Sequence, residues 1–88
     1  MPNPNPNIEV TVVVSGQSAT VKANIHQKVE NLVRDALNQT GNQGQPPANW
    51  ELRTSDGILI DQNLTIQNAG IVQGMKLFLS PHAGAGGN

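Results

Sequence analysis

The hydrophobic period of this chain changes from two to about 3.6, and this change leaves few possible folds. Residues 8–14 and 18–25 alternate apolar and polar side chains, which is the pattern of half-buried strands. Between residues 29 and 37 the apolar side chains recur at spacings of three and four, as in an amphipathic helix. Ser15-Gly16-Gln17 separates the two strands and predicts a tight turn, because glycine takes positive φ without steric cost. We therefore expect a hairpin followed by a helix.

Further strand-like segments follow the helix, after a break rich in Gly, Asn, Gln and Pro that no helix can cross. They are the alternating segment 50–54, the short apolar run 58–60 behind the turn Ser55-Asp56-Gly57, and 75–79, which Pro81 should end. Trp50 shares a face with Leu52 and is expected in the core. Between the last two strands, the expected inward anchors are Leu64, Ile66 and Ile71.

The predicted order of elements is β-β-α-β-β-β. A helix that joins two strands of one sheet usually makes them a parallel pair, since such a crossover needs a dozen or more residues. One mixed, twisted sheet of four to five strands would then pack on the single helix. This arrangement is an α+β domain of the β-grasp class.

The chain divides into a leader, one domain and a tail. Residues 1–7 alternate Pro and Asn, which favours a disordered or polyproline-like leader. Residues 8–80 form the predicted domain, and residues 81–88 a flexible, Gly-rich tail. An 88-residue chain of this kind is expected to be one domain and a monomer.

Composition excludes several classes of function. The five basic and six acidic residues are scattered, and there are two aromatic residues, which argues against nucleic-acid binding. The absence of cysteine removes disulfides and thiolate chemistry. No apolar run is long enough for a membrane, and the N-terminus does not have the pattern of a signal peptide. We therefore expect a cytoplasmic protein that binds neither nucleic acid nor membrane.

Catalytic patterns are also missing from the sequence. His26 and His82 have no partners at the spacing of a metal site or a catalytic triad, and no pair of carboxylates is arranged for acid–base chemistry. The glycine cluster follows the last strand and does not join a strand to a helix, so it is no phosphate-binding loop. No enzymatic activity, cofactor or metal is expected.

Three motifs resemble ubiquitin, and the resemblance covers residues 8–87. Lys28-Val-Glu-Asn-Leu32 resembles the start of the ubiquitin helix, and Gly44-Gln-Pro-Pro47 matches the Gly-x-Pro-Pro that follows that helix. Ile71-x-x-Gly74-x-x-Leu77 resembles the approach to the last strand of ubiquitin-like domains. In character the chain is most similar to bacterial ubiquitin-like proteins encoded beside activating-enzyme, conjugating-enzyme and deubiquitinase-like genes. That resemblance implies an antiviral pathway.

The tail Ala83-Gly-Ala-Gly-Gly87 completes the resemblance. Ubiquitin-like modifiers react through a C-terminal glycine carboxylate, so the resemblance implies conjugation through Gly87 and Gly86 by way of adenylate and thioester or ester intermediates. Glycine lets the backbone pass through a narrow enzyme channel. Asn88 implies a precursor that a peptidase, of which a metallopeptidase is one candidate, cuts between Gly87 and Asn88. The implied partners are this peptidase, an activating enzyme that binds the ATP, a conjugating enzyme and target proteins.

The apolar recognition patch of ubiquitin is not reproduced. Arg53 stands where that patch has its central isoleucine, and the neighbouring positions carry Ser15, Gly16 and Ser80. If the phase set by Leu77 and Leu79 holds, Phe78 turns outward beside Arg53, with the composition of an interface hot spot. A shifted phase would instead place Phe78 in the core. The predicted partner surface comprises Phe78, Arg53, Lys76 and His82.

Two other functions remain open at this point. One is a sulfur carrier for cofactor biosynthesis, with a thiocarboxylate on its terminal glycine. The other is a non-covalent β-grasp interaction module, for which Gly87 would be dispensable. Chain formation on Lys22, Lys28 or Lys76 is a further possibility, against the alternative that these lysines are ordinary solvated residues.

Overall fold

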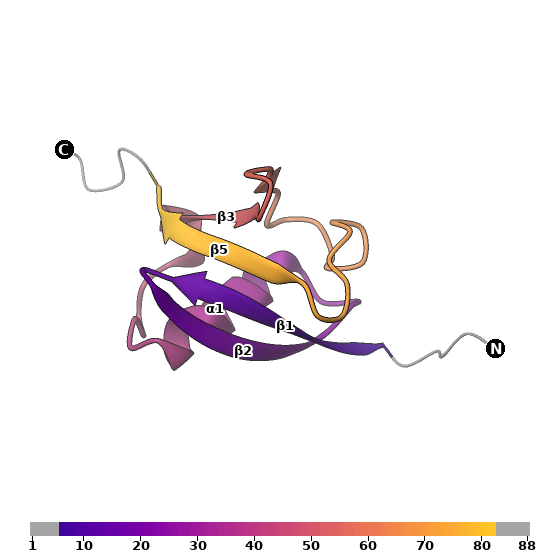
Figure 1. The fold of residues 1–88 in the computed structure, drawn as a ribbon, viewed down its shortest axis with the longest axis horizontal. Coiled ribbons are helices and arrows are strands. Elements are labelled where there is room, and N and C mark those ends of the chain that lie inside the picture. Colours follow the sequence, from indigo (N-terminus) through magenta and orange to yellow (C-terminus); the bar gives the residue numbers. More distant parts are fainter. Residues whose placement is uncertain (1–5, 83–88) are drawn as a thin grey trace.

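A computed structural model describes residues 6–82, which form a five-stranded mixed sheet with one α-helix against one of its faces (Figure 1). This architecture confirms the predicted α+β, β-grasp class. The elements in chain order are β1 Asn7–Val14, β2 Gln17–Asn24, α1 Val29–Gln39, the 3₁₀ helix η1 Pro47–Asn49, β3 Trp50–Thr54, β4 Leu59–Ile60 and β5 Lys76–Pro81.

The last strand in sequence lies in the middle of the sheet, whose order is β2-β1-β5-β3-β4. β1 and β5 run parallel, with Val12 opposite Leu77, whereas the β1–β2, β3–β5 and β3–β4 pairs are antiparallel. The sheet therefore contains a parallel pair, as expected, but its members are β1 and β5, since the strands that α1 joins, β2 and β3, are not neighbours in the sheet. Because β5 contacts both β1 and β3, it joins the N-terminal hairpin to the later strands.

The β1–β2 hairpin closes through a two-residue turn at Ser15 and Gly16. Both residues have positive φ, at 50° and 86°. A two-residue turn with positive φ at both positions is of type I′, whose twist matches the right-handed twist of the strands it joins. The turn predicted from the sequence is confirmed.

The core fills the space between the sheet and α1. Alternate residues from Val10 to the end of β1, in the middle of β2 and β5 and in the first half of β3 are buried, together with one face of α1. The fully buried large side chains are Leu32, Leu37, Leu52, Ile66, Leu77, Val10, Val12, Val14, Val21, Val29 and Val33. Trp50 is buried with them and Ile71 is 2% exposed, as expected.

Leu64 was expected to point inward, and this prediction is wrong, since its side chain is 39% exposed. The backbone of this loop has another task. The first N–H groups of a helix have no partner within it, and Lys28 makes no side-chain cap. The Val29 N–H donates to the Leu64 carbonyl at 2.8 Å, and the Glu30 N–H to the Gln62 carbonyl at 3.1 Å. With the Leu64 carbonyl directed at α1, its side chain faces outward.

The sheet extends slightly beyond the predicted domain at both ends. β1 begins at Asn7, inside the predicted leader, and β5 includes Pro81, which pairs with Trp50. Pro81 and His82 were predicted to belong to a flexible tail, but both are held against β3 and η1. Within residues 6–82, no helix is long and apolar enough to cross a bilayer.

Candidate functional site

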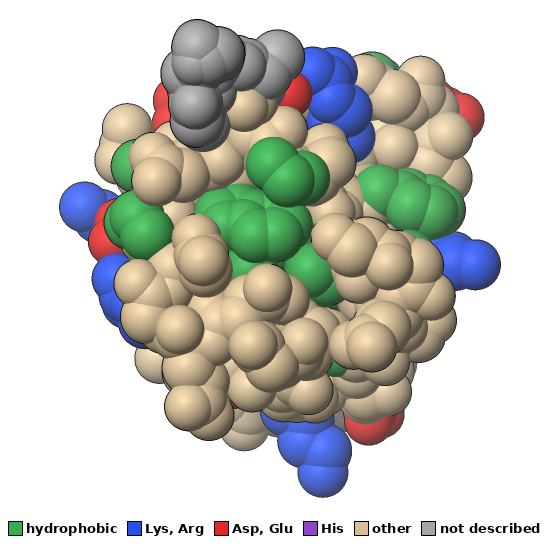
Figure 2. All heavy atoms as spheres, turned by 90° about the vertical axis from the view of Figure 1, so that its left-hand side faces the viewer, with side chains coloured by type: hydrophobic (Ala, Val, Ile, Leu, Met, Phe, Trp, Pro, Cys, Tyr) green, Lys and Arg blue, Asp and Glu red, His purple; other side chains and the backbone are tan. Residues whose placement is uncertain are grey.

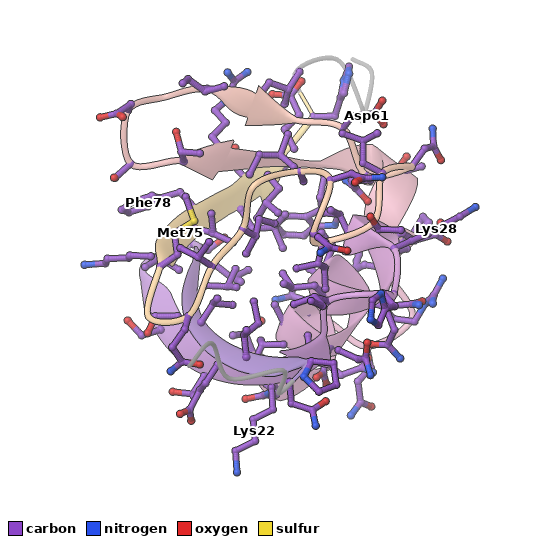
Figure 3. The ribbon with its side chains drawn as sticks, turned by 90° about the vertical axis from the view of Figure 1, so that its right-hand side faces the viewer. Lys22, Lys28, Asp61, Met75 and Phe78 are labelled. Atoms are coloured by element: carbon purple, nitrogen blue, oxygen red, sulfur yellow. The ribbon has the colours of Figure 1, made fainter. Side chains whose placement is uncertain are left out.

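The outer face of the sheet, opposite α1, carries one transverse row of side chains. The strand register aligns Val13 of β1 with Phe78, Phe78 with Arg53 of β3, and Arg53 with Leu59 of β4. Phe78 is 38% exposed and points away from the core (Figure 3). The outward phase predicted for Phe78 is therefore confirmed, and the alternative of a core position is wrong. We call Val13, Phe78, Arg53 and Leu59, together with Lys76, the outer-face row.

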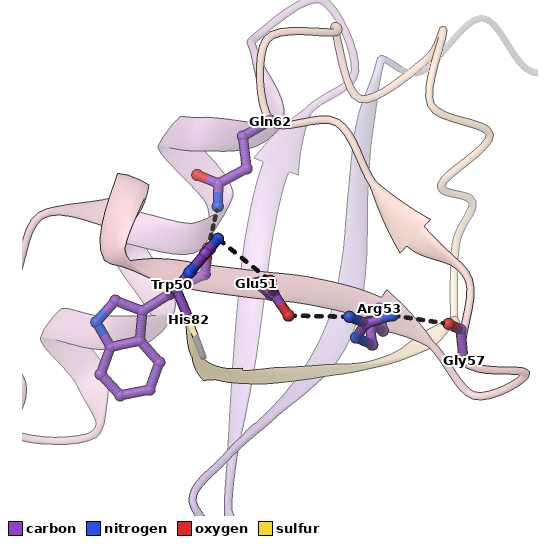
Figure 4. A network of polar contacts seen from close by, with 6 residues as sticks. All are labelled: Trp50, Glu51, Arg53, Gly57, Gln62 and His82. Carbon is purple, nitrogen blue, oxygen red and sulfur yellow. Dashed lines mark hydrogen bonds and ion pairs between the residues drawn. The ribbon is translucent and has the colours of Figure 1, made fainter. Parts of the chain in front are cut away.

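Arg53 and Lys76 flank Phe78 in different ways. The Arg53 guanidinium donates to the Gly57 carbonyl at 3.1 Å and to the Glu51 carboxylate at 2.9 Å, which fixes its position (Figure 4). The Lys76 ammonium lies 5.7 Å from the centroid of the Phe78 ring, within the range of a cation–π contact. The structure thus brings together three of the four residues predicted for a partner surface. Whether partners use them stays a prediction.

His82 lies apart from that row, where the chain leaves β5. Its backbone N–H donates to the Asn49 carbonyl at 2.7 Å, and its Nε2 lies 3.5 Å from Glu51 Oε2. Glu51 therefore contacts Arg53 with one carboxylate oxygen and His82 with the other (Figure 4). Apart from the outward phase of Glu51 in the alternating segment, no sequence pattern indicates this bridge.

A groove of about 560 Å³ opens beside His82. We call it the exit groove; it is lined by Glu30, Arg34, Pro46, Pro47, Ala48, Trp50, Glu51, Leu59, Ile60, Gln62, Asn63 and His82. Figure 2 looks at the end of the molecule where β5 ends and shows apolar side chains gathered in the middle of this face. No local sequence pattern indicates this groove, because its walls come from α1, η1, β3, β4 and the following loop.

Gln62 and one ion pair shape the groove. The Gln62 amide donates to the Trp50 carbonyl at 2.8 Å and to the Pro47 carbonyl at 3.1 Å, and so ties the loop after β4 to η1 and β3. On the α1 side, the Arg34 guanidinium pairs with the Glu30 carboxylate at 3.0 Å. Backbone carbonyls and charges at the groove thus have partners within the chain.

Residues 6–82 show no candidate metal centre. No group of three or more His, Asp or Glu side chains in this part of the chain could hold a metal ion. No polar or charged residue described there is buried. The predicted conjugation and processing site, Gly86, Gly87 and Asn88, lies outside the described residues and stays a prediction. The outer-face row and the exit groove are the two candidate recognition surfaces among the described residues.

Comparison with protein families decides the classification of the chain. A family model described as "Protein of Unknown function (DUF2604)" matches residues 3–87. The chain belongs to the DUF2604 family. A relative named "Uncharacterized protein y4jI", from Sinorhizobium fredii, is 40% identical over 80 residues, which cover 91% of this DUF2604 protein. The match spans 62% of the length of that relative.

Solved structures with the same fold are ubiquitin-like. A protein designed de novo on the basis of ubiquitin superimposes with a TM-score of 0.76 at 22% identity, covering 92% of this chain and 94% of its own. Arabidopsis thaliana At2g32350 superimposes with a TM-score of 0.71 at 21% identity, covering 92% of this chain and 93% of its own. Ubiquitin of Caldiarchaeum subterraneum superimposes with a TM-score of 0.70 at 15% identity, covering 88% of this chain and 95% of its own. These likenesses establish that the DUF2604 protein is ubiquitin-like in fold.

Proposed function

We propose that this DUF2604 protein is a ubiquitin-like modifier, cut after Gly87 and then joined to target proteins through the Gly87 carboxylate. The observation that carries the proposal is the ubiquitin-like fold, with its last strand followed within a few residues by Gly86-Gly87. β5 ends at one end of the molecule (Figure 1), and residues 83–87 carry nothing larger than a methyl side chain. Such a segment suits passage through a narrow enzyme channel.

The chemistry requires little from the chain itself. A peptidase hydrolyses the Gly87–Asn88 peptide bond and frees the Gly87 carboxylate. That carboxylate attacks the α-phosphate of an ATP held by the activating enzyme, forming an acyl adenylate and releasing pyrophosphate. An enzyme thiol then displaces AMP to give a thioester, and a target amine or hydroxyl displaces the thiol. The DUF2604 protein is the substrate in every step. Because the activation step consumes ATP, we expect the reaction to take place in the cytoplasm.

The outer-face row is the surface we propose for downstream partners. Phe78 offers apolar area beside two cations, and buried aromatic and arginine side chains supply much of the binding energy in protein interfaces. Arg53 is already fixed by two hydrogen bonds, so little side-chain entropy is lost when a partner covers it. In keeping with the resemblance to bacterial ubiquitin-like proteins, we propose that these partners belong to a bacterial conjugation pathway with an antiviral role.

The test is expression of the tagged full-length protein in the bacterium that encodes it. We expect loss of Asn88 by intact mass and adducts larger than the free protein. Gly87→Ala should abolish the adducts, because a methyl group at the reacting residue obstructs a channel fitted to glycine. Gly84→Ala is the matched control and should retain them. Absence of both the cleavage and the adducts in the wild type would refute the proposal.

The same measurement separates the two alternatives. A sulfur carrier would show a thiocarboxylate on Gly87 and no protein adduct. A non-covalent interaction module would show neither modification, and deletion of Gly86 and Gly87 would leave its partner binding unchanged.

A further inference from the structure

The exit groove lies where the chain leaves the sheet. His82, the last described residue, forms part of its wall, and its backbone is held to Asn49 by the 2.7 Å hydrogen bond. The origin of the segment that leads to Gly87 is therefore fixed relative to the groove. An enzyme that acts on Gly87 meets this part of the body first.

The length of that segment limits where such an enzyme can sit. An extended chain spans at most ~3.6 Å per residue, so residues 83–87 place Gly87 within about 18 Å of His82. An activating site that excludes water around an acyl adenylate must enclose the last residues. The enzyme surface around that site then contacts the folded domain close to His82. The exit groove, of about 560 Å³, lies there with His82 in its wall.

The chemistry of the groove indicates what it can receive. Its apolar part consists of Pro47, Trp50, Leu59 and Ile60, with Pro46 and Ala48 at the exposed margin. Its charged margin is already paired, since Glu30 bonds Arg34 at 3.0 Å, and Glu51 bonds Arg53 at 2.9 Å. A charged side chain of a partner would have to break these ion pairs to enter the groove. An apolar side chain would cover Leu59, which is 54% exposed, and the remaining accessible edge of Trp50 at no such cost.

The outer-face row cannot play the same part. Phe78 stands out from a sheet surface and has to insert into a partner, whereas the groove receives a side chain from one. The two surfaces share Leu59 but otherwise face different ways, because Phe78 lies on the outer side of the sheet while Glu30 and Arg34 of α1 line the groove. An enzyme can thus hold the molecule at the groove and leave Phe78 free.

We propose that the exit groove is the docking site of the ATP-dependent activating enzyme and receives an apolar side chain from it. The inference rests on the proposed function, because it assumes that Gly87 is activated. It assigns the groove residues Trp50, Leu59 and Ala48 a part in selecting the enzyme, separate from the glycines that react.

Activation can be measured without knowing the enzyme. The chain from Met1 to Gly87 is incubated with ATP and hydroxylamine in an extract of the bacterium that encodes it. Hydroxylamine attacks the acyl adenylate or thioester and releases AMP or the thiol, and the Gly87 hydroxamate is counted by intact mass. The reaction without ATP gives the background.

Leu59→Ser is the first variant, with Val72→Ser as its matched control. Both side chains are exposed aliphatics, at 54% and 60%, but only Leu59 lines the groove. We expect Leu59→Ser to lower the initial rate of hydroxamate formation at least about tenfold, equivalent to ~1.4 kcal/mol, and Val72→Ser to leave it unchanged. Both variants should melt like the wild type.

Ala48→Arg fills the groove mouth from an exposed position and should also block activation, whereas Asn68→Arg, exposed and outside the groove, should not. If the wild type forms no hydroxamate, the proposed function itself fails. If it does and both groove variants match their controls, the groove inference is wrong while the proposed function stands. A loss for Phe78→Ala, with or without one for Leu59→Ser, while Ala48→Arg matches its control would move the enzyme to the outer face and overturn the inference, because Leu59 belongs to both surfaces and Ala48 to the groove alone.

Discussion

Leu77 and Phe78 are neighbours on β5 that face opposite sides of the sheet, so their alanine variants form an internal comparison. Leu77 is fully buried between the sheet and α1, whereas Phe78 is 38% exposed on the outer face. Removing a buried leucine side chain costs about 2–5 kcal/mol, the sum of lost burial and the cavity left behind. For a domain of this size, ~3 kcal/mol corresponds to a fall in Tm of roughly 12–24 °C.

Phe78→Ala should cost much less. It removes the contact with Lys76, worth roughly 0.5–1 kcal/mol at an exposed site, and cross-strand packing on Val13 and Arg53 of similar size. The surroundings are open to water, so no closed cavity forms. We expect a loss of about 1 kcal/mol and a fall in Tm of roughly 4–8 °C.

The assay is thermal and urea unfolding followed by fluorescence. Trp50 is the single tryptophan and is buried, so its emission reports the state of the core. Circular dichroism on the same samples tests whether unfolding is two-state, which the comparison requires. A loss for Phe78→Ala as large as that for Leu77→Ala would refute the outward phase of Phe78, and with it the outer-face row.

Three further variants test separate features. Gly16→Ala should lower the free energy of unfolding by ~1–2 kcal/mol in urea unfolding, because Gly16 has φ of 86°. An added Cβ meets no atom within 4 Å, so the cost is conformational alone. Gly16→Asn, which tolerates positive φ better, should recover most of the loss. Gln62→Ala should cost about 1–3 kcal/mol by removing the donor to two part-buried carbonyls, whereas exposed Gln67→Ala should fall within ±0.5 kcal/mol. Ile66→Ala should lower Tm by more than 8 °C and Leu64→Ala by less than about 4 °C, and equal shifts would contradict the observed loop.

Strand phase was predictable from the sequence because it depends on local alternation. Leu77 and Leu79 fix the inner face of β5, and the same rule places Arg53 outside next to buried Leu52. The β1–β2 turn was equally local, since Gly16 marks it. A parallel pair was expected from the helix between strands, a topological rule that did not identify its members: α1 joins β2 to β3, whereas the pair is β1 with β5.

The parts that sequence could not supply depend on distant partners. The outward position of Leu64 follows from its carbonyl bonding Val29, a contact between loop and helix that no periodicity encodes. His82 reads as a tail residue until the fold brings Glu51 and Asn49 beside it. The exit groove combines α1, η1, β3 and β4, so it exists only in the folded chain.

The central place of β5 also governs how the protein can be made. β5 is the last element to be synthesised, yet it is the only strand that bonds to both halves of the described sheet, β1 with β2 and β3 with β4. Until residues 76–81 have left the ribosome, the two halves share no backbone ladder and the apolar face of α1 lacks part of its cover. Folding of this sheet must therefore wait until β5 has been synthesised. A ribosome stalled before Lys76 would hold an unfinished sheet, open to proteases and chaperones.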